Sequence, residues 1–424
     1  MKKTLLIFVG LFVFIGFSNF AFAQKEEEKK EKLFGVKFSG YVKNDFYYDT
    51  REVEGGREGH LLFWPKAANY DIEGNDINAH GSFHFLAIQT RLTGNITGPD
   101  ALGAKTSAMF EGEFFGHSDP DINGFRLRHA LVKLNWEKSE LLTGQTWHPM
   151  FILENFPGTV SFNTGLGFQP FSRNPQIKYT FKTENFKLAA TVFSERDFQS
   201  RNIFGFPSSD YIRNSKIPAL NLQFNYGLTN NEAQTAFNTG FAVNFKTIRP
   251  SLTTNLGYIT NETLSSLSAQ VYIMRKFKPL SVKFATLYTE NANEMFIPSG
   301  FAHYEILNLT KGEFSYLPTR NAIAWLDIST TGKTWQFGLF GGYNKNLGTL
   351  KDVISTPGGL GINIEHLYRL SPRVFYFNGK LQVGAELEYT VAAYGDGTFT
   401  ANAIPKNAEE VANLRIILGV FYHF

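Results

Sequence analysis

Apolar and polar residues alternate along most of the chain from Leu33 onward. Near the start of this region Val36 and Phe38 share one parity, while Lys37 and Ser39 take the other. At the C-terminus every second residue is apolar: Leu414, Ile416, Leu418, Val420, Tyr422 and Phe424. Side chains two residues apart lie on the same face of a β-strand, so the pattern predicts strands with one apolar face. Apolar residues at helical spacing do not recur after residue 33.

The alternating stretches predict sixteen antiparallel strands. They span 34–50, 82–97, 102–116, 125–137, 140–147, 175–183, 186–197, 217–227, 236–247, 267–276, 280–290, 318–329, 334–344, 364–377, 381–394 and 411–424. The connections alternate between tight turns, such as Asn378-Gly379, and mostly long loops, such as 51–81. An even strand number with short turns at one end and long loops at the other is typical of transmembrane β-barrels of the bacterial outer membrane. We therefore predict an all-β fold, a closed antiparallel barrel with periplasmic turns and extracellular loops.

The last strand has to close this barrel against the first, because an open sheet edge in lipid would leave backbone groups unpaired. Its apolar face would contact outer-membrane lipid. The terminal Phe424 with Tyr422 two residues before it resembles the C-terminal signal by which the barrel-assembly machinery recognises such proteins. We predict that these two residues act as the assembly signal.

The N-terminus predicts export. Lys2 and Lys3 precede an apolar run at 5–17, and Ala21-Phe22-Ala23 forms a small-x-small cleavage site. This arrangement indicates a cleaved secretory signal peptide at 1–23. A charged spacer follows at 24–32, and residues 33–424 form a single barrel domain, located in the bacterial outer membrane.

Composition excludes several functions. The 424 residues include no cysteine, and removal of Lys2 and Lys3 leaves 39 basic against 38 acidic residues, so no nucleic-acid partner is indicated. Asp119, Asp121 and Asn123 imitate the start of a calcium loop, but Ala130 stands where a bidentate glutamate is needed. No catalytic motif or metal-ligand spacing is present, so we predict a protein that is not an enzyme and holds no metal or cofactor.

A barrel of sixteen strands is too wide for side chains to fill, which predicts a water-filled channel for small hydrophilic solutes. Residues 148–174 form an apolar, glycine-punctuated segment after the fifth strand, with Glu154 and Arg173 among its few charges. We expect this segment to fold inward as a constriction loop. The alternative is an outside loop packed on its neighbours.

Strand parity places fourteen basic and nine acidic side chains in the lumen, an excess of five positive charges that predicts a mild anion preference. The basic set is Lys37, Lys43, Arg91, Lys105, Arg126, Arg128, Lys178, Lys182, Lys187, Lys246, Lys283, Arg369, Arg373 and Arg415; the acidic set is Asp45, Asp49, Glu111, Glu113, Glu195, Asp197, Asp327, Glu386 and Glu388. As principal pore-lining residues we predict Lys43, Arg91, Glu111, Arg126, Arg128, Lys178, Arg369, Arg373 and Glu386, with Glu111 and Glu386 on the wall opposite Arg91 and Arg128. Because Arg128 shares parity with the outward Val132, a β-bulge is expected near His129.

Several stretches in a consistent order resemble trimeric outer-membrane porins of the DcaP-like, dicarboxylate-transporting kind. They are GYVKNDFYYDTR at 40–51, AIQTRLTG at 87–94, EGEFFG at 111–116, FRLRHALVKLNW and LLTGQTWHP within 125–149, SRNPQIKYT at 172–180 and LYRLSPRV at 367–374. The resemblance implies a sixteen-stranded homotrimer with an inward loop, a lumen that favours anions, and carboxylates among its solutes. Small outward residues such as Ala104, Ala108 and Gly112 would permit close contact between barrels. The loops and the short spacer depart from the family.

A second function class stays open on the sequence. A structural or adhesive barrel would share the strand pattern and use its long loops to bind a partner. A transporter for hydrophobic solutes would need an apolar interior, against which the predicted inward charges argue.

Overall fold

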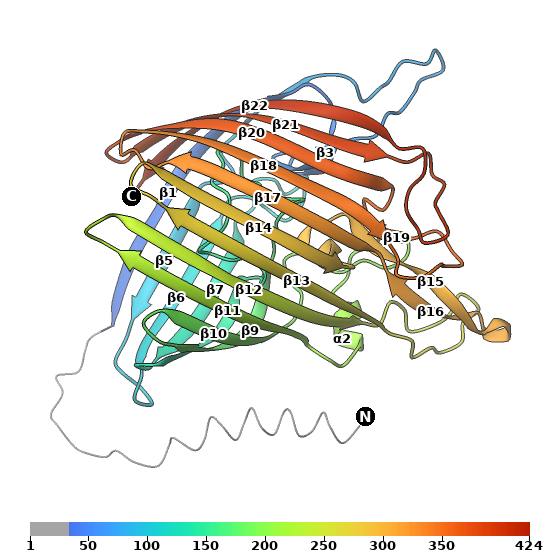
Figure 1. Cartoon of the computed structure of the whole chain (residues 1–424), viewed down its shortest axis with the longest axis horizontal. Coiled ribbons are helices and arrows are strands. Elements are labelled where there is room, and N and C mark those ends of the chain that lie inside the picture. Colours follow the sequence, from blue (N-terminus) through green and yellow to red (C-terminus); the bar gives the residue numbers. More distant parts are fainter. Residues whose placement is uncertain (1–33) are drawn as a thin grey trace.

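The chain forms a closed antiparallel β-barrel, seen from the side in Figure 1. The computed structural model describes residues 34–424; the predicted signal peptide and charged spacer lie outside this range. The barrel strands are β1 (Gly35–Asp49), β4 (Ser82–Leu86), β5 (Arg91–Thr97), β6 (Lys105–Glu113), β7 (Arg126–Asn135), β8 (Ser139–Trp147), β9 (Arg173–Lys182), β10 (Phe186–Phe193), β11 (Ala219–Asn230), β12 (Thr235–Ile248), β13 (Leu264–Lys276), β14 (Leu280–Glu290), β17 (Arg320–Thr330), β18 (Trp335–Gly348), β20 (Ile364–Asn378), β21 (Leu381–Tyr394) and β22 (Glu409–His423). β4 and β5 are two parts of one interrupted wall strand, so the barrel has sixteen wall strands, which we call staves. The predicted fold class is therefore confirmed.

The barrel closes between its first and last strands. β1 pairs with β22, with Val42 opposite Tyr422, and its other edge pairs with β4 and β5. Gly40 N donates to Phe424 O at 3.2 Å and Phe424 N donates to Gly40 O at 3.1 Å, so the ladder reaches the last residue. β1 is therefore paired on both edges over Asp45–Asp49 and the sheet closes on itself, which is the condition for a barrel in lipid.

One predicted strand, 82–97, is interrupted in its middle. Leu86 pairs with Asp45 whereas Arg91 pairs with Tyr41, so the stave carries one residue more than β1 between these two pairs. The extra residue reverses the facing of side chains. Phe83 and Phe85 point outward with exposed rings, but Ile88 is buried in the interior. Unbroken alternation over the predicted strand 82–97 places Ile88 on the outward face with Leu92, and this interpretation is wrong.

The predicted bulge in β7 is confirmed. His129 pairs with Glu111 and Leu127 pairs with Gly112, which leaves Arg128 as the additional residue. Arg126, Arg128 and His129 are consequently all buried on the inner side, while Val132 is exposed on the outer side.

Short turns gather at one end of the barrel and long loops at the other (Figure 1). The short connections are 98–104, 136–138, 183–185, 231–234, 277–279, 331–334 and 379–380, and the long ones are 50–81, 114–125, 148–172, 194–218, 249–263, 291–319, 349–363 and 395–408. Some of the long connections contain structure that the sequence did not predict. These elements are the hairpin β2 (Val53–Gly56) and β3 (Leu61–Pro65), the sheet of β15 (Ser299–Asn308), β16 (Glu313–Pro318) and β19 (Gly358–Leu360), the helix α2 (Asp210–Asn214), and the 3₁₀ turns η1 (Asn293–Met295) and η2 (Leu309–Lys311).

The outer face of the barrel is apolar. Val42, Leu222, Val271, Leu339 and Leu418 all expose more than a third of their surface although they sit in the middle of strands. Exposed aromatic rings such as Tyr343 and Tyr422 lie toward the two ends of this face. Within residues 34–424 no helix is long and apolar enough to cross a membrane.

Candidate functional site

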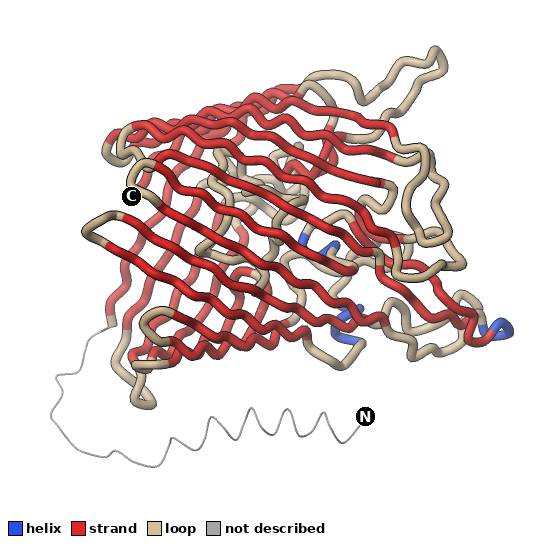
Figure 2. The backbone as a smooth tube through the Cα atoms, viewed as in Figure 1, coloured by secondary structure: helices blue, strands red, loops and turns tan. Residues whose placement is uncertain are grey.

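The segment 148–172 folds into the barrel. Loops behind the strands of the wall are drawn in tan in Figure 2. Its far part is fastened to β20, β21 and β18. Glu386 Oε2 accepts hydrogen bonds from Val160 N at 2.5 Å and Ser161 N at 2.9 Å. Arg369 Nη1 donates to Leu166 O at 3.2 Å and Asn344 Nδ2 to Gly167 O at 2.9 Å. Because these partners lie on inner faces of wall strands, the segment crosses the lumen.

Its near part is held by β13 and β14. Gln270 Nε2 donates to Met150 O at 2.5 Å, Asn155 Nδ2 donates to Phe284 O at 3.0 Å, and Lys283 Nζ donates to Phe156 O at 2.8 Å. Gly167 has a φ of +91°, a conformation that residues with a Cβ rarely adopt, where the segment turns back toward the wall. The loop is therefore tied at both halves to side chains of the barrel.

Further loops join this segment inside the mouth, which the sequence did not anticipate. Trp64 of β3, Phe162 and Phe171 of the inward loop, and Met295 and Phe296 of segment 291–297 belong to one buried apolar cluster. Inward residues of the wall, including Ile323, Trp325, Phe340 and Leu367, complete it. The sequence pattern named only segment 148–174 as inward, because it assigns wall strands but does not say which loops share an apolar core.

The most concentrated charge network lies on the wall of β5, β6 and β7. Glu113 Oε1 accepts from Arg126 Nη2 at 2.7 Å, and Glu113 Oε2 accepts from Arg128 Nη1 at 2.8 Å and from Arg91 Nη2 at 3.2 Å. Glu111 Oε1 accepts from Arg128 Nε at 2.7 Å. Glu111 thus sits beside Arg91 and Arg128 on one wall. The prediction that Glu111 faces these arginines across the lumen is wrong, since β6 is hydrogen-bonded to both of their strands.

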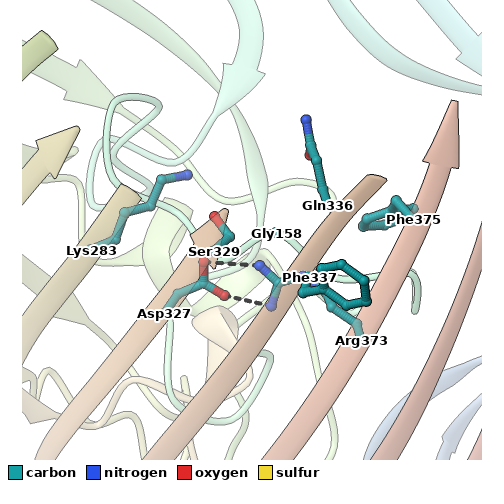
Figure 3. A pocket seen from close by; sticks show the side chains of 8 residues that line it. All are labelled: Gly158, Lys283, Asp327, Ser329, Gln336, Phe337, Arg373 and Phe375. Atoms are coloured by element: carbon teal, nitrogen blue, oxygen red, sulfur yellow. Dashed lines mark hydrogen bonds and ion pairs between the residues drawn. The ribbon is translucent and has the colours of Figure 1, made fainter. Parts of the chain in front are cut away.

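Most other inward basic residues also have a carboxylate partner. Lys43 lies 3.0 Å from Asp45, Arg369 lies 3.2 Å from Glu388, and Arg415 lies 2.6 Å from Asp49. Arg373 makes a two-point contact with Asp327 at 2.8 and 3.0 Å beside a cavity of about 190 Å³, which Lys283 also lines (Figure 3). Burial without such partners would be costly for these charges.

The two charges assigned to the constriction loop have different places. Glu154 is on the loop and lies 3.2 Å from Lys187 of β10. Arg173 is the first residue of β9, fully buried, with Nη2 2.6 Å from Asp197 and its guanidinium over the ring of Trp147. Lys178 of β9 donates to Gln223 at 3.0 Å. The pore-lining role of these and the other predicted residues stays a prediction.

Sequence reasoning missed several titratable groups in the loops. His60 of the β2–β3 hairpin lies 2.8 Å from Asp45, and burial lowers the pKa of its imidazole. Glu294 of η1 lies 2.6 Å from Lys246, and burial raises the pKa of its carboxyl to about 7. Burial also lowers the pKa of His148 to about 3. No spacing in the sequence signals these contacts, because each joins a loop to a distant strand.

Tyr422 and Phe424 are both about half exposed at the short-turn end of β22. Of the small residues expected outward, Ala104 is buried in the β5–β6 turn, and the ring of Phe125 covers Gly112. Ala108 lies between Ile96 and Val132 on the outer face.

The chain matches no protein-family model and no curated protein, whereas its fold is similar to those of solved bacterial outer-membrane proteins. The outer membrane channel DcaP of Acinetobacter baumannii is 16% identical over 92% of this chain and 97% of that one, with a TM-score of 0.67. An anion-selective porin from Comamonas acidovorans is 12% identical over 92% and 100%, with a TM-score of 0.55. The trimer form of in-vitro folded OmpT from Vibrio cholerae is 11% identical over 93% and 100%, with a TM-score of 0.52. At these identities the similarity concerns the fold.

Proposed function

We propose that the protein is an outer-membrane porin that lets small hydrophilic solutes diffuse through a narrowed, charged lumen. The observation that carries the proposal is a closed barrel with an apolar outer face whose interior is crossed by the tethered segment 148–172. Such a segment narrows a wide barrel without filling it with a separate plug domain. The short-turn end then faces the periplasm and the long loops face outside.

The lumen supports a mild preference for anions. The basic residues assigned to it outnumber the acidic ones by five, and fixed charge along a narrow aqueous path attracts counter-ions. Chloride and small carboxylates are the solutes that this sign favours. The anion-selective porin with a similar fold is consistent with it.

Purified protein in a planar lipid bilayer tests the proposal. We expect stepwise conductance and, under a tenfold potassium chloride gradient, a reversal potential of the anion-selective sign. Absence of conductance steps from correctly folded, heat-modifiable protein would contradict a porin. A reversal potential of the opposite sign would contradict only the selectivity.

The proposal includes export by the signal peptide 1–23, insertion by the barrel-assembly machinery and assembly into a homotrimer. The trimer rests on the sequence resemblance and on the trimeric form of one protein of similar fold. Light scattering in mild detergent measures it, and a monomer as the sole species would contradict it.

A specific feature favours the adhesive alternative. The β15–β16 hairpin and the neighbouring loop 249–263 expose apolar side chains at the long-loop end, with Leu309 at 73% and Ile259 at 77%. Deletion of residues 303–316 would abolish cell-surface attachment if this function holds, whereas conductance of the barrel would remain.

A further inference from the structure

The excess positive charge of the lumen is unevenly placed. Of the fourteen basic residues that strand parity assigns to the lumen, nine have a carboxylate within ion-pair distance among residues 34–424. The remaining five form no such pair within the described chain: Lys37, Lys105, Lys178, Lys182 and Lys283. Each of them lies in the half of its strand next to the short turns. The arginine network near the loop is, by contrast, locally compensated.

Two of these lysines, Lys178 and Lys182, lie on the wall of β7 to β10 beside two further inward lysines, Lys133 and Lys187. Lys182 and Lys187 are directly opposite each other in the β9–β10 ladder, with both side chains on the inner face. Lys178 lies four residues before Lys182 on the same face of β9. Lys133 of β7 completes what we name the lysine patch (Lys133, Lys178, Lys182 and Lys187). Among residues 34–424, two carboxylates lie within ion-pair distance of it: Glu140 at 4.0 Å from Lys133 and Glu154 at 3.2 Å from Lys187.

Like charges directly opposite in a ladder destabilise a sheet. In the patch, Lys178 and Lys182 nevertheless donate to neutral acceptors rather than to carboxylates. Lys178 donates to Gln223 at 3.0 Å and Lys182 donates to Asn135 at 3.4 Å. Lys187 is 52% exposed and Lys133 is 37% exposed, so water and solutes reach the patch. An anion from solution would supply the missing negative charge.

We propose that the lysine patch is an anion-binding site in the vestibule between the short turns and segment 148–172, and that it, rather than the arginine network, sets the ion preference. Its ligands are small anions, chloride and carboxylates, that enter from the short-turn side. The ion preference rests on the proposed channel function; the binding site does not.

The sequence offers a direct probe of the local potential because it contains no cysteine. Asn225 of β11 is opposite Lys187 in the ladder and faces inward. A single thiol in Asn225→Cys is allowed to react with an anionic and with a cationic methanethiosulfonate reagent. The ratio of the two rates, divided by the ratio for a free thiol in solution, measures the potential at the patch.

We expect the ratio to favour the anionic reagent. It should fall about fivefold when Lys182→Gln and Lys187→Gln are added, because both charges lie within a Debye length of the thiol at 0.1 M salt. The matched control is Lys278→Gln with Lys333→Gln, which removes the same charge from exposed short turns of other strands. It should leave the ratio unchanged. Asn238→Cys on β12 serves as a second probe if Asn225→Cys does not fold.

Conductance separates this proposal from the channel function. In a working channel, Lys182→Gln with Lys187→Gln should shift the reversal potential toward zero, and the control should not. An unchanged reagent ratio in the patch variant overturns the proposed site, whatever the conductance. A lowered ratio in a protein that never conducts supports the site and contradicts the porin.

Discussion

Glu386 is the wall residue that holds the tip of the inward loop, and its replacement by glutamine should loosen that loop. One carboxylate oxygen accepts from Val160 N and Ser161 N, and both partners are buried. Glutamine preserves the shape and one acceptor oxygen but removes the charge. The wall strand β21 keeps its ladder to β20 and β22, so the barrel should still form.

The magnitude follows from the kind of bond lost. Hydrogen bonds to a charged group contribute about 1 kcal/mol more than neutral ones, so two bonds lose about 2 kcal/mol. A loss of this size raises the undocked fraction of the loop tip about thirtyfold. Glu386→Ala should act more strongly, because two buried N–H groups would lack an acceptor, at about 1–3 kcal/mol each. The neighbouring Glu388, which binds Asn163 Nδ2 at 2.9 Å, limits the undocking to the tip.

Hydrogen exchange measured by mass spectrometry reports the docking directly. Peptides that contain Val160 and Ser161 should exchange faster in Glu386→Gln, and faster again in Glu386→Ala, than in the unaltered protein. Single-channel recordings should show more open-channel noise. Glu140→Gln is the matched control, since Glu140 faces the lumen from β8 without contacting the loop. Unchanged exchange in both Glu386 variants, with the barrel folded, would refute the role of Glu386 in holding the loop tip.

Four other outcomes follow from the structure. Burial raises the pKa of Glu294 to about 7, so this carboxyl binds its proton more tightly in the docked segment than in an exposed one. Docking of the segment should therefore weaken as the pH rises from about 4.5 to 7 and stay constant above. Hydrogen exchange at residues 292–297, compared with Glu294→Gln at each pH, tests this, and equal pH profiles in the two proteins would contradict it. Gly40→Ala should prevent barrel closure, because a Cβ there would lie 2.1 Å from Arg91 O; a heat-modifiable band of normal intensity would disprove it. Tyr422→Ala with Phe424→Ala should reduce outer-membrane assembly, measured by fractionation, and normal assembly would show that the terminal pair is dispensable. Arg91→Glu with Arg128→Glu should reduce the folded yield by at least half, because the two new carboxylates would lie beside Glu111 and Glu113 on one wall. A full yield would argue against the pairing of the two arginines with Glu111 and Glu113.

The alternation of residues by itself determined the wall of the barrel. In a strand every second side chain faces the same side, so Val42 and Lys43 could be assigned to opposite faces without any knowledge of their neighbours. The parity that a charged Arg128 shares with the outward Val132 even revealed the bulge in β7. Turn residues and loop lengths then ordered the strands into sixteen staves, because consecutive antiparallel strands are neighbours.

Parity says which face a charge is on but not which charge stands next to it. The neighbours depend on register, and one additional residue between Leu86 and Arg91 was enough to turn Ile88 from the outside to the core. Arg173 and Asp197, or Glu386 and Val160, meet only after the loops have folded over the closed sheet. The tertiary structure alone therefore decided that the arginines are compensated and that the uncompensated charge lies with lysines near the short turns, since ion pairs form over a few ångströms of space and not along the sequence.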